Sequence, residues 1–89
     1  MHITDTIEQR LTAALHPTQL ILEDNSTEHI GHEGAKAGGG HYTLLIVSDA
    51  FTGKSAVARH QMIYAALNGL IGGEIHALSI TAKSPAEHQ

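Results

Sequence analysis

Histidine is the residue type in this chain best suited to chemistry, and its distribution along the chain is uneven. The chain has eight histidines and no cysteine, and three of the histidines fall in the stretch HIGHEGAKAGGGHYTLLIV (29–47), around a glycine-rich segment. An imidazole titrates near neutral pH and is a common metal ligand. Without cysteine, the chain has neither a thiol nucleophile nor the thiolates of a metal cage. Ligation by histidine is therefore the first chemistry to consider.

Structural roles compete with ligation at each of these positions. His76 alternates with two aliphatic residues, which is typical of a half-buried strand residue, and His60 falls on an apolar helical stripe, where a hydrogen-bonded core histidine is the commoner finding. His41 could simply begin a strand. The pair His29 and His32 lacks the spacing of a zinc finger and has no cysteine beside it. No role is assigned to the histidines near helix or chain ends, which are His2, His16 and His88.

A first helix is predicted by the apolar residues that recur at helical spacing over 3–15. Pro17 follows this segment and is expected to end the helix. Thr4 or Asp5 can cap its start, and Glu8 is placed to close a capping box on Asp5.

A second, longer helix is predicted to begin after a cap at Ser55 and to run to about Leu70, where glycines follow. Residues 49–54 before it form a tight turn or one helical turn. Its expected apolar stripe comprises Val57, His60, Ile63, Tyr64, Leu67 and Ile71.

Three strands complete the predicted elements, over 19–23, 41–48 and 75–81. The segment 25–40 is too polar and glycine-rich to pack, so a mobile loop is expected there, and loops of this length are usually functional or disordered. The polar tail 83–89 is expected to fray.

The order of these elements makes the chain one α+β domain (1–89), with helices packed on one face of a three-stranded mixed sheet. The first two strands should pair antiparallel, and the second and third, joined by a crossover helix, should run parallel. Parallel strands start at the same end of a sheet, so His41 and His76 should meet there. The loop that carries His29 and His32 enters at that end as well. The sequence therefore predicts that four of the eight histidines converge at one edge of the sheet.

Composition narrows the possible functions. Five basic residues face nine acidic ones, for a formal charge of −4, which argues against strong nonspecific binding to a phosphate backbone. No apolar run approaches the length of a membrane helix and no signal sequence is visible, so a cytoplasmic protein is expected. Motifs of hydrolases, phosphate-binding loops and zinc proteases are absent from the sequence, and we expect no enzymatic activity.

Five short motifs together resemble the BolA family, and the resemblance covers the chain from the first helix to Pro85. They are His41-Tyr42, Val47-Ser48, Phe51-x-Gly53-Lys54-Ser55, Arg59-His60 and His76-Ala77-Leu78. The resemblance implies a class II KH-like fold, α-β-β-α-α-β. The chain departs from the family at Gln61, where the family often has a second arginine, and in lacking an aromatic residue near the C-terminus.

The resemblance also implies a function. It indicates a non-enzymatic partner of monothiol glutaredoxins that shares a [2Fe-2S] cluster with them, in cluster trafficking or in iron, redox and stress regulation. The glutaredoxin would supply its active-site cysteine and a bound glutathione thiol. Carried over to this chain, the ligands are His76 from the last strand and His29 from the loop, with His32 as a substitute. The isolated chain is expected to hold no cofactor, to bind no membrane and to be a monomer or weak homodimer. Imidazole ligation of one iron is known chemistry for a [2Fe-2S] cluster.

A KH-like fold also admits a second function, as a nucleic-acid-binding transcriptional regulator. The segment FTGKSAVARH (51–60) offers basic residues but has no GxxG loop and no aromatic platform. Lys54, Arg59 and His60 are the candidates for this surface, which could equally contact an acidic protein or DNA.

Overall fold

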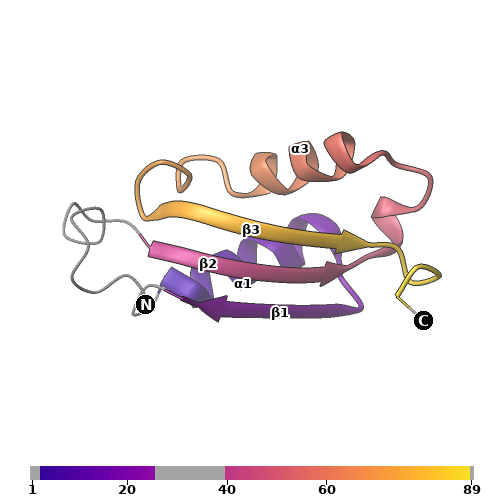
Figure 1. The fold of residues 1–89 in the computed structure, drawn as a ribbon, viewed down its shortest axis with the longest axis horizontal. Helices are drawn as coiled ribbons and strands as arrows, with labels where there is room; N and C mark the ends of the chain where they lie inside the picture. Colours follow the sequence, from indigo (N-terminus) through magenta and orange to yellow (C-terminus); the bar gives the residue numbers. More distant parts are fainter. Residues whose placement is uncertain (1–2, 26–39, 89) are drawn as a thin grey trace.

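The structure is a computed structural model that describes residues 3–25 and 40–88 (Figure 1). Its elements follow in the order α1 (Ile3–Leu15), β1 (Gln19–Asp24), β2 (Gly40–Val47), the 3₁₀ helix η2 (Asp49–Phe51), α3 (Ala56–Ala66) and β3 (Ile75–Lys83). The predicted α+β class is confirmed. Between β2 and α3 stands a single 3₁₀ turn where the family pattern has a second α-helix.

The three strands form one sheet in the order β1-β2-β3. β1 and β2 pair antiparallel, from Gln19 opposite Val47 to Asp24 opposite Tyr42. β2 and β3 pair parallel, as expected for strands joined by a crossover helix. The end of β1, the start of β2 and the start of β3 therefore lie at the same end of the sheet (Figure 1).

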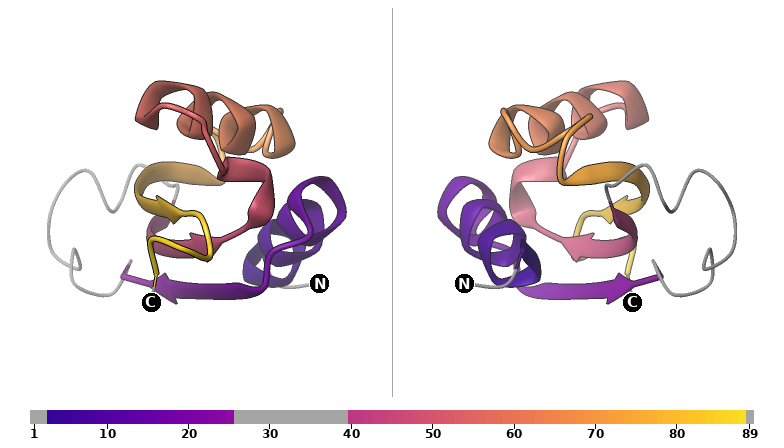
Figure 2. Two further views of the ribbon diagram at one scale, coloured as in Figure 1. Left: turned by 90° about the vertical axis from the view of Figure 1, so that its right-hand side faces the viewer. Right: turned by 90° about the vertical axis from the view of Figure 1, so that its left-hand side faces the viewer.

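Both α-helices cover one face of the sheet (Figure 2). Alternate residues of β2 point to that face because successive side chains of a strand point to opposite sides. The side chains buried there are Tyr42, Leu44 and Ile46 from β2, Ile7, Leu11 and Leu15 from α1, and Ile63 from α3, with Phe51 of η2 and, after α3, Leu67, Leu70 and Ile75 beside them.

The turn after β2 is fixed to α1 by a buried hydroxyl. Ser48 donates a hydrogen bond of 2.6 Å from its Oγ to the carbonyl of Leu15, the last residue of α1. The same Oγ accepts from the N–H of Ala50 and so caps η2. The Ser48 hydroxyl, in a residue that is only 1% exposed, thus both donates and accepts a hydrogen bond.

The predicted start of α1 is wrong in detail. The helix begins at Ile3, so Thr4 and Asp5 lie within its first turn and neither is the cap. The capping box between Asp5 and Glu8 therefore does not form. Asp5 still carries a negative charge near the helix N-terminus, where the helix dipole favours it.

The predicted cap of α3 is confirmed and its predicted end is wrong. Ser55 accepts a hydrogen bond from the N–H of Ala58, but the helix stops at Ala66. The chain then turns tightly through Gly69, whose φ of 89° favours glycine. On the expected apolar stripe, the structure exposes three residues, namely Val57, Tyr64 and Ile71.

Two further expectations concern segments without regular structure. Residues 26–39 lie outside the described ranges, so the predicted mobility of the loop at 25–40 stays a prediction. The tail was expected to fray from Lys83, yet Lys83 belongs to β3 and residues 84–88 form a turn. In the described part of the chain, no helix has the length and apolar character to span a membrane.

Candidate functional site

A β-bulge places His76 at the start of β3. Gly40 pairs with Ile75 and the next residue of β2, His41, pairs with Ala77, so His76 is an extra residue without a partner in the register. A bulge of this kind shifts the alternation of side chains along the strand. His76 and Ala77 are consequently both exposed. The expectation that His76 is half-buried by simple alternation is therefore wrong.

The bulge brings two imidazoles together. The ring centroids of His41 and His76 are 5.1 Å apart, with an interplanar angle of 48°. His41 is half-buried and His76 is exposed. The predicted convergence is thus confirmed for these two histidines, while His29 and His32 lie outside the described residues.

Backbone hydrogen bonds hold the start of both strands. Gly40 donates from its N–H to the carbonyl of Glu74, at 2.8 Å, and Ile75 donates to the carbonyl of Leu70, at 2.9 Å. A Cβ atom at Gly40 would collide with the ring of Tyr42, so the close approach of that ring requires glycine. The strand start that presents His76 is therefore rigidly built.

The end of β1 is fastened to the same place. Asn25 donates from its N–H to the carbonyl of His41, at 2.7 Å. Asn25 and Gly40 are the described residues on either side of the segment 26–39, and both stand at the end of the sheet that carries the two imidazoles.

The donor set at this end is suited to an iron site that takes nitrogen ligands. Imidazole nitrogen can replace thiolate on one iron of a [2Fe-2S] cluster, and the exposed ring of His76 is reachable from solvent. Within residues 3–25 and 40–88, no group of three or more His, Cys, Asp or Glu side chains is placed to hold a metal ion.

The second predicted surface lies at the other end of β3. Lys54, Arg59 and His60 line a cavity of about 260 Å³ together with Ala56, Ala82 and Glu87. Six residues of strand separate His76 from Ala82, which corresponds to about 20 Å. The structure therefore brings Lys54, Arg59 and His60 together but keeps them apart from the histidine pair.

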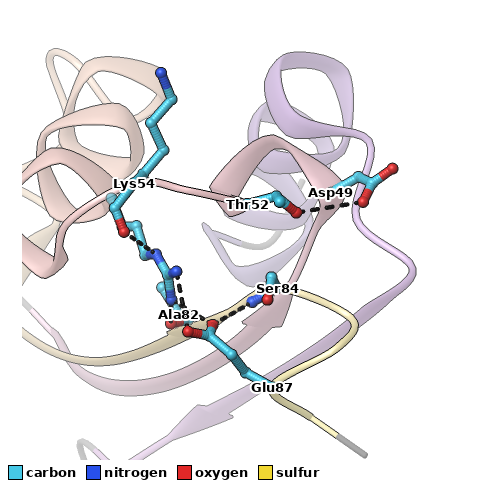
Figure 3. A network of polar contacts seen from close by, with 7 residues as sticks. Asp49, Thr52, Lys54, Ala82, Ser84 and Glu87 are labelled. Carbon is cyan, nitrogen blue, oxygen red and sulfur yellow. Dashed lines mark hydrogen bonds and ion pairs between the residues drawn. The ribbon is translucent and has the colours of Figure 1, made fainter.

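A carboxylate, that of Glu87, forms part of the lining of this cavity. Arg59 forms a salt bridge with Glu87, with 2.6 Å between Nη1 and Oε1. Glu87 also accepts a hydrogen bond from the N–H of Ser84, at 2.8 Å (Figure 3). The Arg59 guanidinium and then the Ser84 N–H stabilise the ionised form and lower the pKa of Glu87 from its ordinary value of 4.5 to about 2.

Glu87 is not among the site residues predicted from the sequence, although the sequence contains a signal for it. In the segment SPAE, a serine is followed by proline at the first helical position and by glutamate three residues after the serine. That spacing is typical of a capping box, in which the glutamate returns to the N–H of the serine. The structure shows this contact between Glu87 and Ser84.

Comparison with known proteins agrees with the fold and the motifs. The family profile described as BolA-like protein matches residues 11–87. SufE-like protein 1, chloroplastic/mitochondrial, of Arabidopsis thaliana is 45% identical over 86 residues, which are 91% of this chain and 23% of that protein. The DNA-binding transcriptional regulator BolA of Escherichia coli is 36% identical over 80 residues, which are 90% of this chain and 73% of that protein.

A solved structure shows the same architecture. The BolA domain of SufE1 from Arabidopsis thaliana superposes with a TM-score of 0.84 at 45% identity, over 98% of this chain and 96% of that domain. The chain spans less than a quarter of the whole Arabidopsis protein that carries such a domain. The profile match, the identities and the shared fold establish that the chain belongs to the BolA-like family.

Proposed function

We propose that this BolA-like chain is an adaptor that binds a monothiol glutaredoxin and ligates, together with it, a shared [2Fe-2S] cluster. The observation that carries the proposal is the bulge at the start of β3, which exposes the His76 imidazole beside that of His41. A ligand for a cluster held by another protein has to be exposed, and His76 is exposed at a strand start that backbone hydrogen bonds hold.

The histidines of this chain have two roles in this proposal, as cluster ligands and as a positioning residue. His76 supplies one imidazole nitrogen, and the second comes from the segment between β1 and β2, from His29 or, in its place, His32. His41 packs its ring beside His76 and so restricts the orientations that His76 can take. The cluster is cargo in this scheme, and its thiolate ligands come from the glutaredoxin cysteine and glutathione, because this chain has no cysteine.

The test is a reconstitution of the complex with a monothiol glutaredoxin, glutathione, iron and sulfide. The visible absorption and circular dichroism report the cluster, and the nitrogen hyperfine coupling of the reduced cluster reports imidazole ligation. We expect His76→Ala to abolish the nitrogen coupling. The matched control is His60→Ala, which removes a half-buried imidazole of α3 that lines the cavity beside Ala82 and not the start of β3, and should leave the coupling intact.

The loop ligand is tested in the same assay. His29→Ala should weaken the nitrogen signal in part if His32 replaces it, and the double variant should match His76→Ala. An unchanged coupling in His76→Ala, or a coupling lost only in His60→Ala, would refute the proposal.

Nucleic-acid binding is a second candidate, favoured by the name of the Escherichia coli relative and by the exposed Lys54 beside Arg59. The Arg59 charge, however, is paired with Glu87, and the chain carries a formal charge of −4. We therefore expect no binding of single- or double-stranded DNA at submicromolar Kd in physiological salt. If such binding is measured, and the double variant of Lys54 and Arg59 lowers its salt slope, this second function takes precedence.

A further inference from the structure

The guanidinium of Arg59 is held in place by the main chain. Its Nε donates to the carbonyl of Lys54, at 3.0 Å, and its Nη1 donates to the carbonyl of Ala82, at 3.1 Å. The centre of the guanidinium lies 6.0 Å from the centroid of the Phe51 ring. None of these contacts involves the C-terminal turn, so the arginine stays oriented when that turn moves.

Glu87 occupies this site as a ligand would. Both of its oxygens face the guanidinium, with 2.6 Å between Nη1 and Oε1 and 3.2 Å between Nη2 and Oε2. Such a fork is the geometry in which arginine binds a carboxylate with specificity. The Arg59 side chain is only 12% exposed, whereas that of Glu87 is 50% exposed. Arg59 is therefore largely buried in the wall of the cavity, whereas Glu87, which binds to it, lies at the surface.

The occupant is attached by a short connection. Glu87 lies four residues beyond Lys83, the last residue of β3, and the turn that carries it is closed by hydrogen bonds from the N–H groups of Glu87 and His88 to the carbonyl of Ser84. A short tether keeps the carboxylate at a high effective concentration. The turn can nevertheless open without breaking any pairing of β3.

We propose that the cavity around Arg59 is a carboxylate-binding site for an acidic segment of a partner protein, and that Glu87 is its built-in competitor. In the resting chain the C-terminal turn, residues 84–88, closes the site. A carboxylate from the partner replaces Glu87 on the guanidinium and the turn swings outward.

The charges in and around the cavity support this choice of ligand. Arg59 is the cation that holds the carboxylate, and the first turn of α3, at Ala56, adds the positive end of a helix dipole. Lys54 also lines the cavity, although its side chain extends away from Glu87 (Figure 3). Glu87 stays ionised at neutral pH because its pKa is about 2. Release therefore depends on competition by another anion and not on protonation, and the switch operates without a change of pH.

The experiment titrates the isolated chain with an acetylated hexaglutamate peptide and, separately, with inorganic phosphate. The NMR signals of the Arg59 Nε–H and the Ser84 N–H report occupancy. We expect Glu87→Gln to bind the peptide roughly fivefold more tightly than the unmodified chain, since a partly exposed ion pair is removed from competition. The control Glu8→Gln removes a carboxylate from the exposed face of α1 and should change nothing.

Two further variants make the outcome decisive. A chain that ends at Pro85 should match Glu87→Gln, and Arg59→Gln should abolish saturable binding while thermal unfolding shows that the chain remains folded. Equal affinities of the unmodified chain and Glu87→Gln would overturn the competitor role. Phosphate binding that is tighter than peptide binding would overturn the assignment of a carboxylate ligand, and peptide binding that survives Arg59→Gln would overturn the site itself.

Discussion

The side chains gathered near the two ends of β3 differ in how far they are exposed and paired within the chain. At the start of the strand, a bulge exposes His76, and a second imidazole lies beside it. At the end of the strand, Arg59 is held by two carbonyls and a carboxylate, and little of it reaches solvent. The His76 imidazole at one end is exposed, whereas the Arg59 guanidinium at the other is paired with groups of the chain itself.

The two ends of β3 should therefore differ in how much they contribute to the stability of the fold and in how accessible they are to a partner. Contacts made within the chain stabilise the fold, whereas an exposed ligand contributes little until something binds it. Variants at the arginine end should therefore affect unfolding first, and variants at the histidine end should affect the cluster first.

The largest expected effect on stability comes from Arg59→Ala. This change removes the guanidinium that donates to the carbonyls of Lys54 and Ala82 and to Glu87, which keeps only the N–H of Ser84. We expect the free energy of unfolding, measured by urea titration, to fall by about 2 kcal/mol, as for lost hydrogen bonds to a charged group. His76→Ala, which removes an exposed side chain, should change it by less than about 0.5 kcal/mol. The comparison between the two ends fails if His76→Ala costs as much as Arg59→Ala.

A similar loss is expected from Gly40→Ala, which tests the rigidity of the histidine end. The new Cβ atom would collide with the buried ring of Tyr42, and such overpacking typically costs about 1–3 kcal/mol. Gly73→Ala is the matched control, because its Cβ would meet nothing closer than the Leu70 carbonyl oxygen at 3.8 Å. The cluster yield with glutaredoxin should fall for Gly40→Ala and not for Gly73→Ala. Equal yields would mean that the start of β2 does not position the site.

The smallest effect is a change in pH dependence. The folded chain lowers the pKa of Glu87 from 4.5 to about 2, so the stabilisation by its ionised form is fully present above about pH 4.5 and is lost as the pH falls toward 2. The Tm of Glu87→Gln should therefore fall less than that of the unmodified chain between pH 5 and pH 2. At pH 7 the Tm of the variant should be slightly lower, because the ion pair with Arg59 is absent. Parallel curves for the two proteins would show that this carboxylate is not paired in solution.

The sequence predicted the architecture because its strongest signals are periodic. The apolar spacing over Ile3–Leu15 and the strand before Ser48 set the elements, and the crossover rule then forced β2 and β3 to run parallel. That single inference placed His41 next to His76, although they are 35 positions apart in the chain.

Other features were not predicted, for different reasons. The bulge at His76 depends on how Gly40 and Ile75 pair across the strands, and strand periodicity does not contain that information. The end of α3 at Ala66 was placed too late because the apolar spacing outweighed a local signal, Asn68-Gly69, at which the chain turns with a φ of 89° at the glycine. The turn at Glu87 was also readable from the spacing of Ser84, Pro85 and Glu87 and was overlooked because a polar tail suggested fraying.

The bulge has a consequence for how copies of this protein behave at high concentration. β3 is an edge strand of the sheet, and a regular edge offers its unpaired N–H and C=O groups to the edge of another molecule. An extra residue at His76 twists that edge out of register, and Lys83 adds a charge at its far end. Both features oppose edge-to-edge aggregation, so the bulge that exposes His76 also helps to keep copies of the chain apart.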